Sequence, residues 1–125
     1  MSQAWPSIVD IYRQQPPAVC GDVDFWRAAQ GIGQLALHIS ETSLGQALFG
    51  WTSMLDLCIQ QTDAPPYSVP YLRVSPLRSG NVEFRYIDTP ISARQWQREV
   101  SAEDTVPRLI RFLDQLRWVG QPVRR

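Results

Sequence analysis

The hydrophobic and polar positions of the N-terminal third predict two short helices followed by a strand. Residues 7–13 follow a proline and repeat apolar side chains at helical spacing, which predicts a helix that ends before the next pair of prolines. Asp24 is placed to cap a second helix over residues 25–30, and Gly31 is expected to end it. Alternating apolar and polar residues over 34–40 then predict a strand with one face toward the core.

The middle of the chain gives weaker signals. Residues 47–51 fit neither the helical nor the strand period, and residues 52–54 are expected to cap one helical turn. Alternation resumes over residues 55–60, which predicts a second strand. Residues 62–70 contain three prolines and no period, so they are expected to form the longest internal loop.

A hairpin is the clearest local structure that the sequence predicts. Residues 71–75 and 82–87 have strand character, and the segment 77–81 between them has the composition of a turn. Residues 95–100 place apolar and polar side chains on alternate sides and predict a further strand. The hairpin and this strand are expected to belong to one antiparallel sheet.

The C-terminal part predicts an amphipathic helix. Ser101 and the acidic residues after it match a helix start, and an apolar stripe then follows at helical spacing until the helix ends near Trp118. Residues 119–125 are expected to fray. The side chains expected in the core of this half are Phe84, Trp96, Leu109, Phe112, Leu113 and Leu116.

This order of elements predicts an α+β fold: an antiparallel sheet of four to five strands, short N-terminal helices, and a C-terminal helix packed on one sheet face. At 125 residues with 44% hydrophobic side chains, the chain is expected to be a single domain over residues 1–125. No apolar run is long enough to cross a bilayer, and the first residues lack the pattern of a secretory signal. We therefore expect a cytoplasmic protein with no membrane contact.

The charge is balanced overall but not along the chain. All twelve basic residues are arginines, which is typical of a GC-rich bacterial genome, and twelve acidic residues balance them. Residues 1–66 contain two arginines and six acidic residues, whereas residues 67–125 contain ten arginines and six acidic residues. This asymmetry has two interpretations: an interaction surface, or two halves that cancel each other on folding.

One alternative function is a small enzyme. Cys58, His38 and Asp56 are the ingredients of a nucleophilic site if His38 lies on the polar side of a strand beside Cys58. The simpler interpretation is an ordinary histidine and a reduced, buried thiol. The segment 31–36 matches the glycine pattern of dinucleotide sites, but it is expected to open a strand rather than a helix. We expect no catalytic residue, no metal ion and no cofactor.

A second alternative is a module that binds single-stranded nucleic acid. Arginines and aromatic residues interleave on the predicted hairpin and the strand after it, as they do in such modules. They are Tyr71, Arg73, Arg78, Arg85, Tyr86, Arg94, Trp96 and Arg98. The zero net charge opposes the long-range attraction that nucleic-acid binding uses, and the arginines also fit the solvated side of an amphipathic sheet.

In overall character the chain resembles the immunity proteins that bacteria encode beside secreted antibacterial toxins, including the polymorphic toxins of type VI secretion. The stretches that carry the resemblance are residues 50–58, 70–75 with 84–88, and 94–98 with 108–118, within the span 24–118. The resemblance implies one role: tight binding of one toxin, in a 1:1 complex, with occlusion of its active site. Immunity proteins share no pattern of functional residues, so none is carried over.

If the toxin acts on nucleic acids, its cleft is basic, and the acidic segment from residue 22 to 56 then becomes the expected contact surface. An acidic toxin would instead suit the arginine-bearing face of the sheet, which is the alternative contact surface. Complementary charge speeds association, and a few aromatic anchors supply most of the binding energy. Trp96 and Trp118 are expected in the core, so the anchors are sought among the other tryptophans. The predicted partner-binding residues are Asp22, Asp24, Trp26, Glu41, Trp51 and Asp56.

Overall fold

The computed structural model describes residues 2–14 and 22–118, and it has the predicted α+β fold. The helices are α1 (Trp5–Tyr12), α2 (Val23–Glu41), α3 (Leu44–Ala47) and α4 (Thr105–Leu116), with the 3-10 helices η1 (Thr89–Arg94) and η2 (Ala102–Asp104). The strands are β1 (Phe49–Ser53), β2 (Asp56–Gln60), β3 (Tyr71–Pro76), β4 (Val82–Ile87) and β5 (Trp96–Val100). Cys20 and the tail over 119–125 lie outside the described residues.

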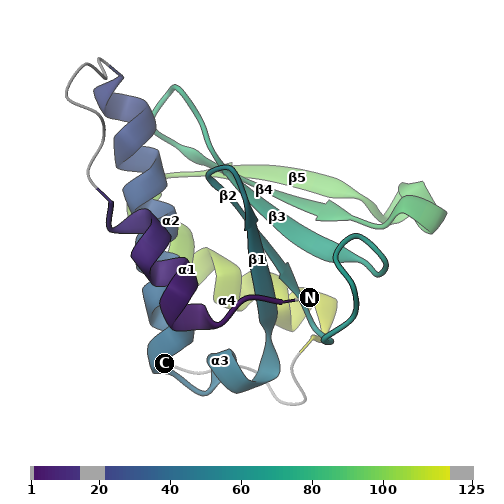
Figure 1. Ribbon diagram of the computed structural model, residues 1–125. Coiled ribbons are helices and arrows are strands. Elements are labelled where there is room, and N and C mark those ends of the chain that lie inside the picture. The colour runs from purple at the N-terminus through teal and green to yellow at the C-terminus, as the bar shows by residue number, and fades with distance from the viewer. Residues whose placement is uncertain (1, 15–21, 119–125) are drawn as a thin grey trace.

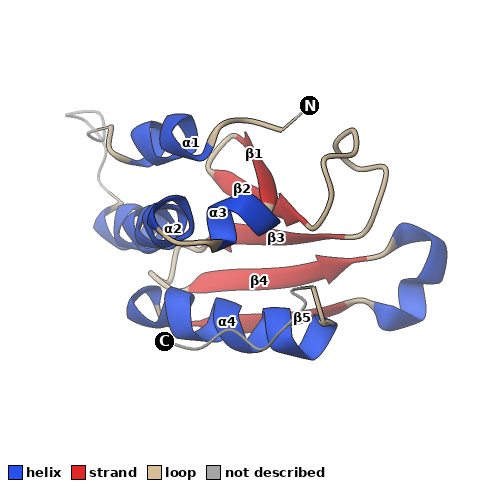
Figure 2. Cartoon of the chain, turned by 90° about the horizontal axis from the view of Figure 1, so that it is seen from below, coloured by secondary structure: helices blue, strands red, loops and turns tan. Residues whose placement is uncertain are grey.

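The strands form one antiparallel sheet in which each strand pairs with the next along the chain, in the order β1-β2-β3-β4-β5. The longer helices, α1, α2 and α4, pack on one face of this sheet and enclose the main hydrophobic core with it (Figure 1). Figure 2 shows the strands stacked in chain order from β1 to β5. The opposite face of the sheet is therefore left without a helix among the described residues.

Two tight turns fix the register of the meander. The predicted turn at residues 77–81 is confirmed: the Leu77 N–H donates to the Asn81 carbonyl at 2.9 Å, and Gly80 supplies a φ of 93°. The helical turn expected at residues 52–54 is wrong, because this segment ends β1 and enters a two-residue turn to β2. The Tyr12 hydroxyl donates to the Leu55 carbonyl at 2.8 Å and so ties that turn to α1.

The largest correction concerns α2. Gly31 does not end a helix and residues 34–40 do not form a strand, since α2 continues as one helix of 19 residues through both segments. The side chains of Ile32, Leu35, Ala36 and Ile39 repeat at helical spacing and are all buried, so the apparent alternation was part of a helical stripe. The glycine pattern of residues 31–36 consequently lies inside a helix.

Other elements approach α2 closely at positions 31 and 33, and this close approach explains why glycine occupies both positions inside a helix. A Cβ on Gly31 would lie 2.6 Å from the Ala102 carbonyl oxygen, and one on Gly33 would lie 2.8 Å from the Tyr12 Cβ. The Thr105 hydroxyl donates to the Gly31 carbonyl at 3.0 Å across the same contact. The two glycines therefore serve the packing of η2 and α1 on α2, which the local sequence does not reveal.

The predicted core of the C-terminal half is largely confirmed. Leu109, Leu113 and Phe84 are fully buried, and Phe112 packs between Phe84 and Trp96 with ring centroids 5.1 and 4.8 Å away. Leu116, Trp96 and Trp118 are half-buried and pack against this core. The helix ends slightly earlier than expected, where Arg117 adopts a left-handed conformation with a φ of 58°. No helix of the described residues is both long and apolar enough to span a membrane.

Candidate functional site

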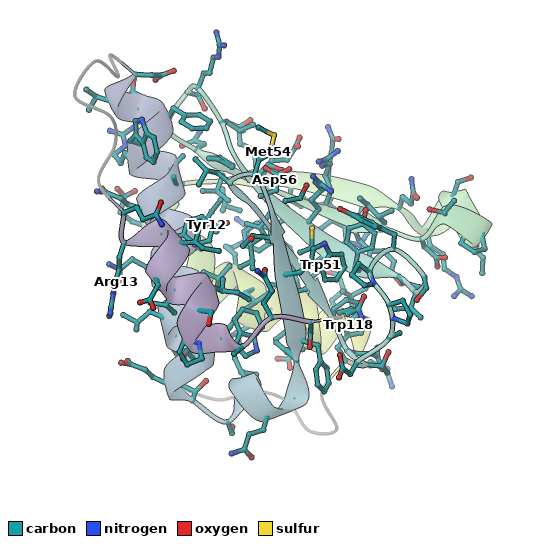
Figure 3. All side chains as sticks on the ribbon, viewed as in Figure 1. Tyr12, Arg13, Trp51, Met54, Asp56 and Trp118 are labelled. Carbon is teal, nitrogen blue, oxygen red and sulfur yellow. The ribbon has the colours of Figure 1, made fainter. Side chains whose placement is uncertain are left out.

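The sheet face that no described helix covers, called the open face below, is the candidate site. One row of side chains crosses it from β1 to β5, because residues paired across neighbouring strands point to the same side. This row consists of Trp51, Cys58, Arg73, Arg85 and Gln97. Figure 3 shows Trp51 on the side of β1 that faces away from α1.

Three rings form an aromatic cluster (Trp51, Tyr67 and Tyr71) on this face. The centroid distances are 5.3 Å between Trp51 and Tyr67, 5.5 Å between Trp51 and Tyr71, and 5.5 Å between the two tyrosines. Trp51 and Tyr71 are buried, and together with Cys58 they form a small hydrophobic core separate from the main one. Tyr67 is 56% exposed, so it is the member of the cluster that solvent and partners reach.

The loop between β2 and β3 delivers Tyr67 to the cluster. Gln60, fully buried at the end of β2, holds this loop: its side-chain amide donates to the carbonyls of Thr62 and Ala64 at 2.9 and 2.6 Å. The Tyr67 hydroxyl lies close to the polar side-chain atoms of Trp51, Arg73 and Ser53, and their proximity lowers the pKa of Tyr67.

Ion pairs flank the aromatic cluster. Arg73 Nε donates to Asp56 Oδ2 at 2.7 Å, and Arg85 Nε lies 3.3 Å from Glu83 Oε1. Partial burial disfavours the charged form of Arg73, but the hydrogen bond to Asp56 and the nearby Tyr67 hydroxyl outweigh this cost and raise its pKa. Arg73 is therefore a charged side chain that lies between the Asp56 carboxylate and the Tyr67 ring.

Two exposed residues, Tyr67 of the cluster and Met54 in the β1–β2 turn, have a left-handed backbone conformation. Met54 is 93% exposed with a φ of 58°, and Tyr67 has a φ of 69°. The left-handed region costs a residue with a side chain roughly 1–2 kcal/mol. Ser53, whose side chain lies close to the Tyr67 hydroxyl, directly precedes Met54 in the chain. Met54 has this conformation because a two-residue hairpin turn requires a positive φ at its first position, whereas Tyr67 lies in the longer loop between β2 and β3.

The arrangement that a Cys-His-Asp site requires is not formed. His38 lies on α2 and not on a strand next to Cys58, and α2 packs on the helix-covered face of the sheet, whereas Cys58 belongs to the open face. Cys58 is a free cysteine and fully buried, as expected, and burial raises the pKa of its thiol to about 11. The Asp56 carboxylate is bonded to Arg73. Among the described residues, no three His, Cys, Asp or Glu side chains converge in a way that could hold a metal ion.

The six predicted partner-binding residues fall in three places. Asp22, Asp24 and Trp26 lie at the start of α2. Asp22, and not Asp24 as predicted, caps this helix by accepting a hydrogen bond from the Phe25 N–H, and Asp24 lies 3.5 Å from Arg27 in the first turn. Glu41 lies at the other end of this helix, roughly 28 Å away at 1.5 Å per residue. Only the remaining two, Trp51 and Asp56, come together on the open face.

The expected tryptophan anchors differ in exposure. Trp5 and Trp51 are 7% and 6% exposed, and the Trp5 indole donates to the Leu48 carbonyl at 3.0 Å, so both are packing residues. Trp26 is half-buried against Phe25, with ring centroids 6.0 Å apart. Tyr67 was not among the predicted anchors, because the proline-rich loop around it has no period from which its position could be inferred.

The arginines and aromatic residues of the nucleic-acid alternative do not share one face. Arg73, Arg85 and Tyr71 belong to the open face, whereas Tyr86, Trp96 and Arg98 lie on the helix-covered side. Arg98 lies over the Trp96 ring, 5.4 Å from the centroid, while Arg78 lies in a turn and Arg94 lies in η1.

Searches among protein families, curated proteins and solved structures find no match to this chain.

Proposed function

We propose that this chain is an immunity protein that binds one antibacterial toxin and blocks it, and that it makes this contact through the open face. The observation that carries the proposal is the aromatic cluster beside the Arg73–Asp56 ion pair. Tryptophan, tyrosine and arginine are the residue types most enriched among the hot spots of protein interfaces. Here they gather where no described helix covers the sheet.

Two of the three rings of the aromatic cluster are already buried in the chain without a partner. Trp51 and Tyr71 are buried side chains on neighbouring parts of the sheet, and Tyr67 rests on both of them. A preorganised anchor loses less side-chain entropy on binding, and so more of its contact energy appears as affinity. Tyr67 and Met54 provide the exposed apolar surface, and the ion pairs around them provide a polar rim.

The charges of the open face favour a protein partner over a nucleic acid. Arg73 and Arg85 each have a carboxylate within 4 Å, Asp56 and Glu83 respectively. Binding to phosphates depends on cations that release counterions, and an arginine already neutralised by a carboxylate contributes little to it. A toxin surface that presents apolar groups with both acidic and basic side chains around them matches this pattern. Of the predicted contact residues, Asp56 belongs to the rim of the proposed surface, and the buried Trp51 supports Tyr67 from beneath.

The experiment that tests the function is co-expression with the product of the gene next to this one, in bacterial cells without either gene. We expect that product alone to arrest growth, and co-expression of this chain to restore it, with one chain bound per toxin in the purified complex. A harmless neighbouring product, or a toxic one that this chain neither binds nor neutralises, would contradict the proposal.

A further inference from the structure

The two edges of the sheet differ in how their free backbone groups are used. At the β1 edge, the Gln3 N–H donates to the Gly50 carbonyl at 2.8 Å, and the Gln3 side-chain oxygen accepts from the Thr52 N–H at 2.7 Å. These are the outward-facing groups of β1, so the N-terminal segment closes this edge. An edge closed in this way does not pair with another chain.

The direction of the backbone groups on β5 follows from the β3–β4 turn. The Leu77–Asn81 bond marks a hydrogen-bonded pair, and such pairs alternate along an antiparallel ladder. Phe84, three positions after Asn81, therefore belongs to a non-hydrogen-bonded pair with β3. It directs its N–H and C=O toward β5, where Arg98 lies opposite.

The backbone N–H and C=O of Arg98 point toward β4. The backbone groups of its neighbours Gln97 and Glu99 therefore point away from the sheet. β5 is the last strand in the sheet order, and among the described residues no strand or bridge pairs with its outer side. One of these groups, the Gln97 carbonyl, already accepts from the chain's own Arg98 guanidinium at 2.8 Å, so a pairing strand must displace this exposed side chain or share the carbonyl with it. Gln97, Arg98 and Glu99 are all exposed, so β5 is an open edge.

We propose that a second copy of this chain pairs with this edge, β5 antiparallel to β5, about a two-fold axis at Gln97. The two-fold axis can pass beside any of three central residues of β5, Gln97, Arg98 or Glu99, and the chosen residue then lies opposite its own copy in the partner. An axis at Glu99 places two carboxylates opposite each other, and an axis at Arg98 places two guanidiniums opposite each other at the closest strand spacing; both arrangements are repulsive. An axis at Gln97 pairs two neutral amides.

The register about Gln97 also pairs the flanking side chains favourably. It sets Arg98 opposite the partner's Trp96, and Arg98 already lies 5.4 Å from its own Trp96 ring, a contact that the second ring can replace. It sets Gln95 opposite the partner's Glu99. The Gln95 side-chain oxygen accepts from the Asp88 N–H at 3.0 Å, so its NH₂ group remains to donate to a carboxylate.

In the resulting dimer the two sheets join into one, and each copy keeps its own open face. The edge lies at β5, whereas the aromatic cluster lies on the side of β1, β2 and β3, so pairing leaves the proposed toxin-binding surface uncovered. The dimer therefore does not depend on the proposed function, and it is tested without any toxin.

The first test is the mass of the purified full chain in solution, measured by light scattering across the micromolar concentration range. We expect twice the 14.3 kDa of the monomer. Gln97→Pro removes one outward N–H and none of the bonds to β4, so this variant is expected to be monomeric, whereas Gln97→Ala keeps the N–H and the dimer. A monomeric wild type, or a dimer that survives Gln97→Pro, would overturn the proposal.

The second test fixes the register by cross-linking in a Cys20→Ser background. In a hydrogen-bonded pair the Cα atoms are about 5.5 Å apart, which a disulfide spans, so Gln97→Cys is expected to form a covalent dimer on mild oxidation. Glu99→Cys is the matched control, because its two copies would lie more than about 13 Å apart and stay unlinked. Equal cross-linking of both variants, or of Glu99→Cys alone, would contradict the register about Gln97.

Discussion

At the residue scale, Gly31 shows how a single missing side chain sets the distance between two elements. Adding a methyl group at this position places it 2.6 Å from the Ala102 carbonyl, a backbone atom that cannot move aside without shifting η2. Alanine gains roughly 1 kcal/mol of helix propensity over glycine, but overpacking costs about 1–3 kcal/mol. We expect Gly31→Ala to lower the urea midpoint of unfolding, whereas Gln34→Ala at an exposed position of the same helix leaves it unchanged. An unchanged midpoint for Gly31→Ala would show that η2 adjusts freely.

Cys58 gives a prediction about pH at the same scale. Burial raises its pKa from 9.0 to about 11, so the unfolded chain loses this proton at a lower pH than the folded chain does. The stabilisation is complete below pH 9 and is lost as the pH rises toward 11, by roughly 2–3 kcal/mol in total. The free energy of unfolding measured over this window should fall less steeply for Cys58→Ala than for the wild type. Parallel slopes would contradict the shift.

At the element scale, the loop between β2 and β3 depends on one buried side chain. Gln60→Leu removes the two donors that hold the Thr62 and Ala64 carbonyls, and so it should release the loop that carries Tyr67. We expect faster hydrogen exchange over residues 62–70 in this variant. Gln61→Leu, one position further along and exposed, is the matched control and should leave the exchange unchanged. Equal protection in both variants would mean that other contacts hold the loop.

The elements also explain which parts of the fold the sequence could predict. The β3–β4 hairpin and α4 were predicted because their turn residues and apolar stripe are local signals, and tertiary packing agrees with them. The prediction divided α2 wrongly because Gly31 has the character of a helix end, whereas in the structure Gly31 and Gly33 allow distant elements to pack closely on one continuous helix. The open face could not be predicted, because its cluster joins Trp51, Tyr67 and Tyr71 from separate segments.

At the scale of the whole molecule, the acidic and basic halves of the chain fold into one sheet. β1 and β2 come from the acidic half and the other strands from the basic half, and the Arg73–Asp56 pair joins the two across β2 and β3. Part of the charge asymmetry is thus cancelled internally, at the place where the aromatic cluster lies. The surface proposed to bind a toxin is formed by both halves together.

The most direct test of this account compares the affinity for the purified toxin of two double variants, measured by titration calorimetry. One carries Met54→Ser and Tyr67→Ser on the open face, and the other carries Asp24→Arg and Glu41→Arg on α2; all four positions are exposed, and folding is checked by thermal unfolding. We expect the open-face variant to bind at least about tenfold more weakly, a loss of roughly 1.4 kcal/mol or more, while the α2 variant binds like the wild type. Full affinity of the folded open-face variant, with lost affinity of the α2 variant, would contradict the account and place the contact on the acidic helix.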